Sequence, residues 1–205
     1  MSGVLSFLTD FGLRDSYVGE MKARILGFAP GARLVDLTHA VPAGDVAAGA
    51  FLLSRAWSAF PTGTVHLAVV DPGVGTERAA LAVHAEGHWF VGPDNGLLSM
   101  ATGQPDHIWR LEPDLVAGAG ALSATFHGRD LFAPAAARLC LGDEVAQFAN
   151  PALSMNGLEP VVEVVEDRVI GEVLWVDHFG NAITAIDEAS VRAVGPELQI
   201  RVGSL

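Results

Sequence analysis

The sequence predicts an α/β fold, with an N-terminal domain built on a mostly parallel sheet and a smaller β-rich domain after it. Over the first two thirds of the chain, short apolar runs alternate with helix-like segments, which is typical of a sheet covered by helices. After Asn150-Pro151, short runs rich in Val and Ile take over. Half of the 205 residues are hydrophobic and 18% are charged, which is enough apolar material for a buried core.

The expected strands of the first domain are short apolar runs bounded by Gly, Pro or Asp. VLSFLT and VHLAVV are the clearest, because each is apolar almost throughout and ends at an aspartate. Two further runs flank Gly87 and predict a hairpin. We expect strands over residues 4–9, 33–37, 65–70, 81–85, 88–91 and 108–111.

Three helices are expected between these strands. Ser16 and Asp45 can cap the first two, and Pro30-Gly31 and Pro61 can end them. The third is rich in alanine and ends before Gly142. We expect these helices over residues 17–29, 46–59 and 130–141.

The rest of the chain predicts a small, barrel-like β domain. Its expected strands cover residues 161–165, 169–176, 182–186 and 198–202, with one helix over 188–194. We place the boundary within residues 152–160 and expect domains over 1–155 and 156–205.

Composition excludes several classes of function. The charge sum is −12 and the pI is near 4.8, which disfavours binding to nucleic acid phosphates or to acidic membrane surfaces. Cys140 is the only cysteine, so an intrachain disulfide or a four-cysteine zinc site cannot form. The N-terminal residues do not resemble a signal peptide, and no apolar run reaches the ~18 residues of a membrane span. We expect a cytoplasmic protein.

Three aspartates directly follow strand-like runs, where ligands of α/β sheets bind. They are Asp10, Asp71 and Asp177, and a glycine-bearing turn follows each. One such aspartate is common, because Asp starts turns. Three of them favour a functional site.

The segment DPGVGTER predicts a tight turn that brings Asp71 and Arg78 together, although a surface turn with a weak ion pair has the same pattern. In FHGRD, His127 precedes a helix, whose dipole favours the neutral imidazole. Taken alone, this histidine is better explained by a structural role than by a catalytic one. GxGxxG, Walker A, HExxH and GxSxG motifs are missing from the sequence.

Five ordered segments resemble the S-adenosylmethionine (SAM) hydrolases, also called SAM hydroxide adenosyltransferases, which are related to fluorinating and chlorinating SAM enzymes. The segments are LTDFGLRDSYVGEMKARIL, VVDPGVGTERAALAV, FVGPDNGLL, FHGRDLFAPAAA and VDHFGNAIT. The resemblance implies an α/β domain followed by a β domain, and because the sequence stops at Leu205 we expect either a shortened β domain or an incomplete sequence. It also implies a homotrimer with active sites between subunits.

The resemblance also implies roles for individual residues. Asp71, Arg78 and His127 match the catalytic set and are expected to converge in one cavity. Asp10 matches the residue that binds the ribose. Other substrate contacts match Asp15 and Ser16 (methionine end), Asp177 (methionine amine), Phe179 and Asn181 (adenine), and Phe126.

The implied reaction is hydrolysis of SAM to adenosine and L-methionine, without metal or cofactor, by a water that Asp71 orients toward C5′. Halogenating relatives carry hydroxyl side chains in the segments that match Val74 and Gly128, so water is the expected nucleophile. Three alternatives stay open. They are a SAM-dependent halogenase, a non-catalytic SAM or adenosine binding protein, and a metal-dependent phosphohydrolase that uses Asp10, Asp71, Asp94 and Asp130.

Overall fold

The computed structural model describes residues 3–117, 123–194, 199–201 and 203. The chain forms two compact units, Met1–Leu158 and Glu159–Leu205. None of the helices in the described ranges is long and apolar enough to cross a membrane.

The first unit contains a seven-stranded sheet with the order β2-β1-β3-β5-β4-β6-β7. The pairs β1-β2, β1-β3 and β3-β5 are parallel, and the other three are antiparallel. The strands are β1 (Val4–Thr9), β2 (Arg33–Thr38), β3 (Val65–Val69), β4 (Ala80–Ala85), β5 (His88–Pro93), β6 (His107–Leu111) and β7 (Ala149–Ala152).

The predicted α/β class is confirmed, but the sheet is mixed rather than mostly parallel. Glu86 and Gly87 alone join β4 to β5, and both have positive φ angles. Such a two-residue connection can only join antiparallel strands. The predicted hairpin is therefore correct, and it starts the antiparallel half of the sheet. The sequence did not predict β7, which pairs with β6.

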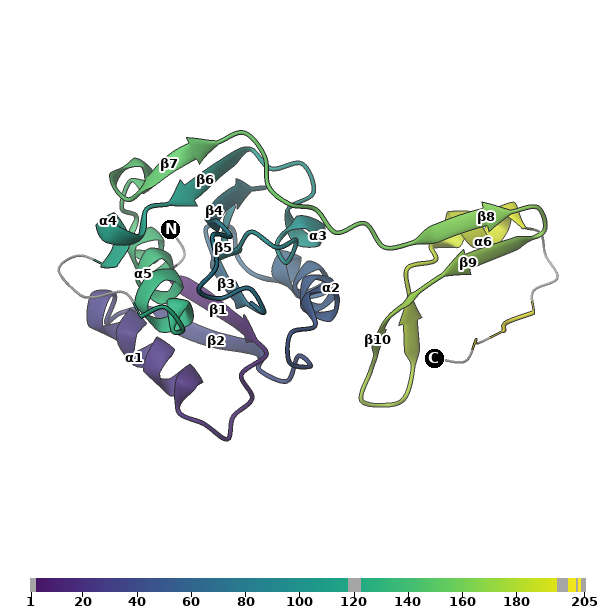
Figure 1. The fold of residues 1–205 in the computed structure, drawn as a ribbon, viewed down its shortest axis with the longest axis horizontal. Helices are drawn as coiled ribbons and strands as arrows, with labels where there is room; N and C mark the ends of the chain where they lie inside the picture. The colour runs from purple at the N-terminus through teal and green to yellow at the C-terminus, as the bar shows by residue number, and fades with distance from the viewer. Residues whose placement is uncertain (1–2, 118–122, 195–198, 202, 204–205) are drawn as a thin grey trace. The chain divides into compact units, whose positions relative to one another are not determined.

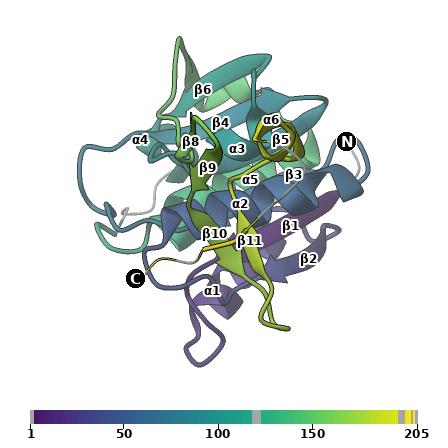
Figure 2. The same ribbon diagram turned by 90° about the vertical axis from the view of Figure 1, so that its right-hand side faces the viewer.

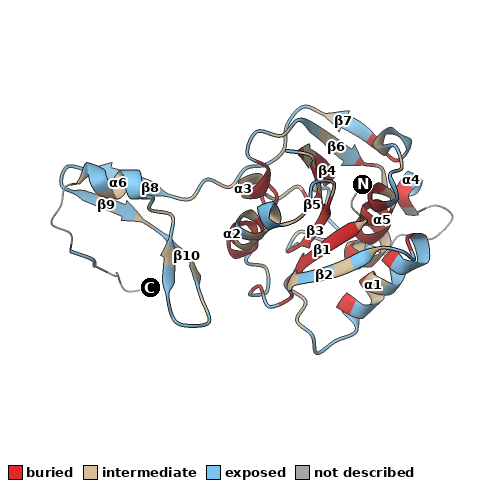
Figure 3. Ribbon diagram, turned by 180° about the vertical axis from the view of Figure 1, so that it is seen from behind, coloured by how far each residue is buried: buried red, intermediate tan, exposed pale blue. Residues whose placement is uncertain are grey.

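Helices cover both faces of this sheet (Figures 1 and 2). Helices α1 (Tyr17–Phe28) and α5 (Ala133–Leu141) lie on one face, and α2 (Val46–Ala56) and α3 (Ser99–Thr102) lie on the other. Every residue of β1 and β3 is buried between them, which explains their continuous apolar sequences (Figure 3). Shorter elements complete the unit: η1 (Trp57–Ala59), α4 (Pro113–Ala117), η2 (Gly128–Phe132) and η3 (Val145–Gln147).

The structure confirms one predicted helix cap and differs from the prediction in two other details of the helices. Asp45 caps α2 as predicted, because its side chain accepts a hydrogen bond from the Ala48 amide. Ser16 does not cap α1. Its backbone is already helical, and its hydroxyl instead donates to Glu20 Oε1 at 2.6 Å. The predicted helix over 130–141 is a π-helical turn, η2, that continues into α5.

The second unit contains two separate two-stranded antiparallel sheets, β8-β9 and β10-β11. Its elements are β8 (Val162–Val165), β9 (Arg168–Gly171), β10 (Val173–Val176), β11 (Ala182–Thr184) and α6 (Glu188–Ala193). None of its described residues is buried, so these hairpins do not enclose a barrel-like interior (Figure 3). The strand expected over 198–202 lies partly outside the described residues, and 199–201 are not in a strand.

Candidate active site

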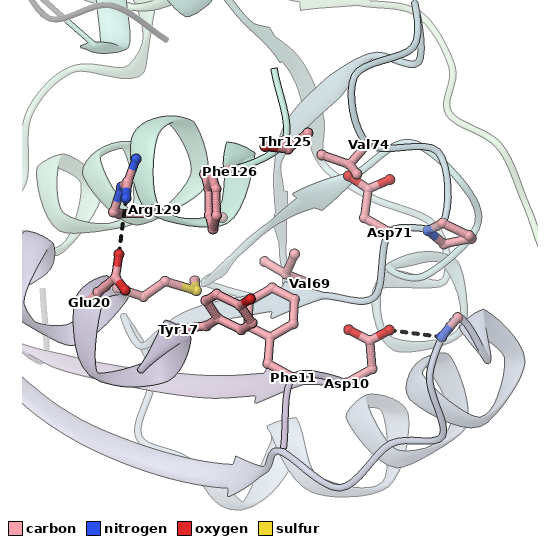
Figure 4. Close-up of a pocket in the computed structure, with 14 residues that line it drawn as sticks. Asp10, Phe11, Tyr17, Glu20, Val69, Asp71, Val74, Thr125, Phe126 and Arg129 are labelled. Carbon is pink, nitrogen blue, oxygen red and sulfur yellow. Dashed lines mark hydrogen bonds and ion pairs between the residues drawn. The ribbon is translucent and has the colours of Figure 1, made fainter. Parts of the chain in front are cut away.

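Two of the predicted aspartates lie at the same edge of the sheet. Strands β1 and β3 are parallel, with Thr9 opposite Val69, so the residues that follow both strands meet at their carboxyl ends. Asp10 and Asp71 both line a cavity of about 630 Å³ at this edge (Figure 4). The Asp10 side chain accepts a hydrogen bond from the Gly44 amide at 2.8 Å.

The lining of this cavity is aromatic on one side and carries three carboxylates and one guanidinium. Figure 4 shows Phe11, Tyr17 and Phe126 between a Glu20–Arg129 ion pair and the two aspartates. The remaining lining residues are small or apolar: Met21, Gly44, Val69, Pro72, Val74, Thr125 and Gly128.

Asp71 and Arg78 form a nearly buried ion pair. Arg78 Nε donates to Oδ1 at 3.0 Å and to Oδ2 at 2.9 Å, and Nη2 also donates to Oδ2. The two side chains are only 5% and 10% exposed. The turn between them folds as the glycines require: Gly75 has φ +80°, and a Cβ there would lie 2.8 Å from the Ala124 carbonyl oxygen.

His127 joins this pair through Arg78. Arg78 Nη2 lies 2.9 Å from His127 Nδ1. Arginine only donates hydrogen bonds, so Nδ1 must accept and a neutral ring carries its proton on Nε2. Burial, and secondly the charge of Arg78, lower the pKa of His127. The direction agrees with the expected neutral imidazole, but burial is the first cause and not the helix dipole.

Arg78 contacts both Asp71 and His127. Contrary to the prediction, however, the three side chains do not line one cavity. Asp71 lines the first cavity, whereas Arg78 and His127 line a second one of about 450 Å³. The Arg78 guanidinium stands between the two and packs 5.1 Å from the centre of the Phe132 ring. Polar and apolar residues contribute about equally to the lining of the second cavity, and its further polar residues are Thr76, Glu77, Arg110, Glu112 and Asn150.

The residues expected at the methionine end do not line the first cavity. Asp15 and Ser16 are exposed, and the Ser16 hydroxyl is engaged with Glu20. Phe126, in contrast, does line it. The nearby lining residues Phe11, Tyr17, Glu20 and Arg129 were not singled out from the sequence. They lie within the sequence segments that carry Asp10 and His127, and this position could have identified them as candidates.

Asp177, Phe179 and Asn181 form a tight turn in the second unit. The Asp177 carboxylate accepts hydrogen bonds from the amides of Phe179 (2.9 Å) and Asn181 (2.8 Å) and from Asn181 Nδ2 (2.7 Å). These bonds, first of all the one from the Asn181 side chain, lower the pKa of Asp177. The turn leaves Phe179 86% exposed.

The carboxylates that a metal-dependent phosphohydrolase would need are engaged separately. Asp71 binds Arg78, Asp94 accepts from the Asn156 amide at 2.7 Å, and Asp130 binds Arg129. Within the ranges that the structure describes, no three His, Cys, Asp or Glu side chains are grouped so that they could hold a metal ion.

Comparison with known proteins identifies relatives over most of the chain. Residues 5–149 match the family model described as the SAM hydroxide adenosyltransferase N-terminal domain. A Salinispora arenicola protein named (R)-S-adenosyl-L-methionine hydrolase is 44% identical over 204 residues, which cover 96% of this chain and 77% of the relative. A protein of the same name from Thermus thermophilus is 45% identical over 194 residues (90% and 75%).

More distant and structural relatives agree with these matches. A fluorinase from an Actinoplanes species is 26% identical over 242 residues, which cover 97% of this chain and 77% of the enzyme. The crystal structure of an uncharacterized conserved protein from Thermotoga maritima superposes with a TM-score of 0.80 at 42% identity. That match covers 89% of this chain and 71% of the other.

Proposed function

The chain belongs to the SAM hydroxide adenosyltransferase family, and on that premise we propose that it hydrolyses SAM to adenosine and L-methionine. Relatives named (R)-S-adenosyl-L-methionine hydrolase that cover nearly all of the chain support this activity. The observation that carries the proposal is the hydrogen-bonded chain Asp71–Arg78–His127, with Asp71 facing a cavity of about 630 Å³.

The reaction is an in-line displacement at C5′. The oxygen of water forms a bond to C5′, the C5′–S bond breaks, and its electron pair neutralises the sulfonium to give methionine. Complete transfer of a water proton to an ordinary carboxylate before attack would cost roughly 16 kcal/mol. Asp71 therefore orients the water and takes its proton as the C–O bond forms. Oδ1 is the better placed oxygen, because it accepts one hydrogen bond from Arg78 and Oδ2 accepts two.

Arg78 positions Asp71 and does not relay its proton. A guanidinium has no acceptor and stays protonated, so no proton passes through it from Asp71 to His127. His127 fixes Nη2 of Arg78 from the other side. In this proposal Asp71 is the catalytic residue that touches the water, and His127 is a positioning residue that acts through Arg78.

Water is favoured over halide as the nucleophile. Val74 and Gly128 carry no hydroxyl group. A Cβ atom at Gly128 would lie 3.2 Å from Met21 Sδ and 3.4 Å from Phe11 Cε2, so a serine there would be crowded. Fluorinases are also the more distant relatives, at 25–26% identity.

Substrate contacts outside the Asp71 region follow from the family resemblance. Asp10 would accept hydrogen bonds from the ribose hydroxyls through Oδ1, because Oδ2 already accepts one from the Gly44 amide. Asp15 and Ser16 would meet the methionine end, and Asp177, Phe179 and Asn181 would approach from the small domain.

A homotrimer with active sites between subunits is part of the proposal. In the described part of the second unit no residue is buried, and nine large apolar side chains are exposed. Such a surface needs a partner. The exposed side chains are Val161, Val162, Val164, Val165, Ile170, Val173, Val176, Phe179 and Ile200. We propose a catalytic domain over 1–155 and a small domain over 156–205. The cytoplasmic location and the independence from cofactors remain predictions.

Incubation with SAM tests the activity. Separated (R) and (S) sulfonium epimers are offered in H₂¹⁸O, with and without EDTA, and products are resolved by chromatography and mass spectrometry. We expect ¹⁸O in the 5′-hydroxyl of adenosine, equimolar methionine and no effect of EDTA. Halogenated adenosine when fluoride or chloride is supplied would identify a halogenase. Binding of SAM without any product would identify a binding protein.

A further inference from the structure

Three aromatic rings lie on one side of the cavity, and only Phe11 among them packs against the hydrophobic core. The ring of Tyr17 lies 6.2 Å from that of Phe11 and 5.8 Å from that of Phe126, measured between centroids. Tyr17 is 42% exposed and Phe126 is 37% exposed. The rings come from three segments, the end of β1, the start of α1 and the residue before His127, and they converge on the cavity (Figure 4).

Charged side chains of both signs lie behind these rings. Glu20 Oε2 is 3.0 Å from Arg129 Nη1, and Arg129 Nε is 2.7 Å from Asp130 Oδ1. The Arg129 guanidinium packs 4.9 Å from the centre of the Phe126 ring. Two carboxylates thus face one guanidinium. Hydrogen bonds from Ser16 and Arg129 lower the pKa of Glu20, which is ionised at neutral pH.

We propose that Phe11, Tyr17, Phe126 and Glu20, here called the aromatic–carboxylate wall, select a sulfonium over a neutral thioether. This inference rests on the proposed SAM hydrolase function and names what recognises the substrate's charge. Aromatic faces attract cations, and the negative charge of Glu20 offsets the guanidinium behind Phe126, which would otherwise repel a sulfonium.

The wall is also expected to hold the substrate more tightly than the product. Before the C5′–S bond breaks, the sulfur is positive and is attracted by the rings and by Glu20. Afterwards it is the neutral sulfur of methionine, and that attraction is lost. The loss of this attraction weakens the binding of methionine relative to SAM and so favours product release.

The test compares SAM with its demethylated thioether analogue, which has the same shape except for one methyl group and the charge. The measured quantities are kcat/KM for SAM and the inhibition constants of the analogue and of adenosine. Glu20→Gln removes the charge and one of the two acceptor oxygens, and it keeps the size of the side chain. Glu86→Gln is the matched control, because Glu86 lies in the β4–β5 turn, at the opposite end of β5 from the cavity edge.

We expect Glu20→Gln to lower kcat/KM for SAM about fivefold and to change both inhibition constants less than about twofold. Tyr17→Leu should show the same selective loss, and Tyr17→Phe, which keeps the ring, should restore the preference for SAM. Equal losses for SAM and the thioether in Glu20→Gln would overturn the inference. So would equal behaviour of the two Tyr17 variants.

Failure of the proposed function gives a different result. A wild-type protein that produces no adenosine from SAM overturns that function. The ratio of the dissociation constants for SAM and the thioether, measured by calorimetry in the same variants, then tests without any turnover whether the aromatic–carboxylate wall selects the sulfonium.

Discussion

Acidification should destabilise the protein through a histidine buried in the centre of its sheet. His66 on β3 is completely buried, and His88 on β5 is 4% exposed. Ser6 Oγ lies 2.7 Å from His66 Nδ1, and His66 Nε2 lies 3.1 Å from His88 Nδ1. Burial, with a smaller contribution from the charge of His88, lowers the pKa of His66 to about 3.

The sign of the effect follows from the two protonation states. In the unfolded chain the imidazole takes up a proton below pH ~6.5, whereas in the folded protein it does so only near pH 3. Stability is therefore lost as the pH falls through this window, and no more is lost below it. At 1.36 kcal/mol for each pH unit, the free energy of unfolding falls by about 2 kcal/mol at pH 5, by about 4 kcal/mol at pH 3 and by about 5 kcal/mol in all.

Urea unfolding at pH 8 and pH 5, followed by tryptophan fluorescence, measures this loss. His66→Gln keeps a neutral polar side chain that does not titrate, so this variant should lose about 2 kcal/mol less than the wild type between the two pH values. His107→Gln is the control, because His107 is exposed. Parallel losses in wild type and His66→Gln would refute the reasoning.

The remaining predictions concern the active site. Asp71→Asn should lower kcat about 10³-fold and change KM for SAM less than about threefold, and wild-type turnover would contradict its role. Asp10→Ala should raise KM about tenfold, and an unchanged KM would remove the ribose contact. His127→Gln should keep far more activity than His127→Leu, because an amide oxygen can accept from Arg78. Since the pKa of His127 is lowered, wild-type kcat should hold at pH 6.5 and fall only in more acidic buffer, and this fall should be absent in His127→Gln.

The parallel half of the sheet and its two aspartates could be predicted from the sequence. Continuous apolar runs identified β1 and β3, and parallel pairing in register then requires Asp10 and Asp71 to meet at one edge. The antiparallel half needed the β4–β5 turn to be interpreted correctly. The hairpin was predicted, but its consequence for β6 and β7 depends on pairing between distant segments.

The approach of His127 to Arg78 could not be derived from local sequence. The two residues are 49 positions apart. Their meeting depends on the fold of the Asp71–Arg78 turn, where Gly75 passes close to the Ala124 carbonyl. The prediction that Ser16 caps α1 was wrong for a local reason. Its residue type favours a helix cap, but Glu20 one turn later offers its hydroxyl a carboxylate. In both cases a tertiary or competing contact decides the outcome.

The position of Arg78 links the catalytic proposal to the charge of the substrate. Because a guanidinium cannot accept a proton, Arg78 cannot take one from Asp71. Any carboxylate is a weak base toward water. Such a weak base can assist water only if the leaving group departs easily. A sulfonium does so, because it leaves as a neutral thioether. A site with one weak base therefore has to choose its substrate by positive charge, and the ionised Glu20 behind the aromatic rings meets that requirement.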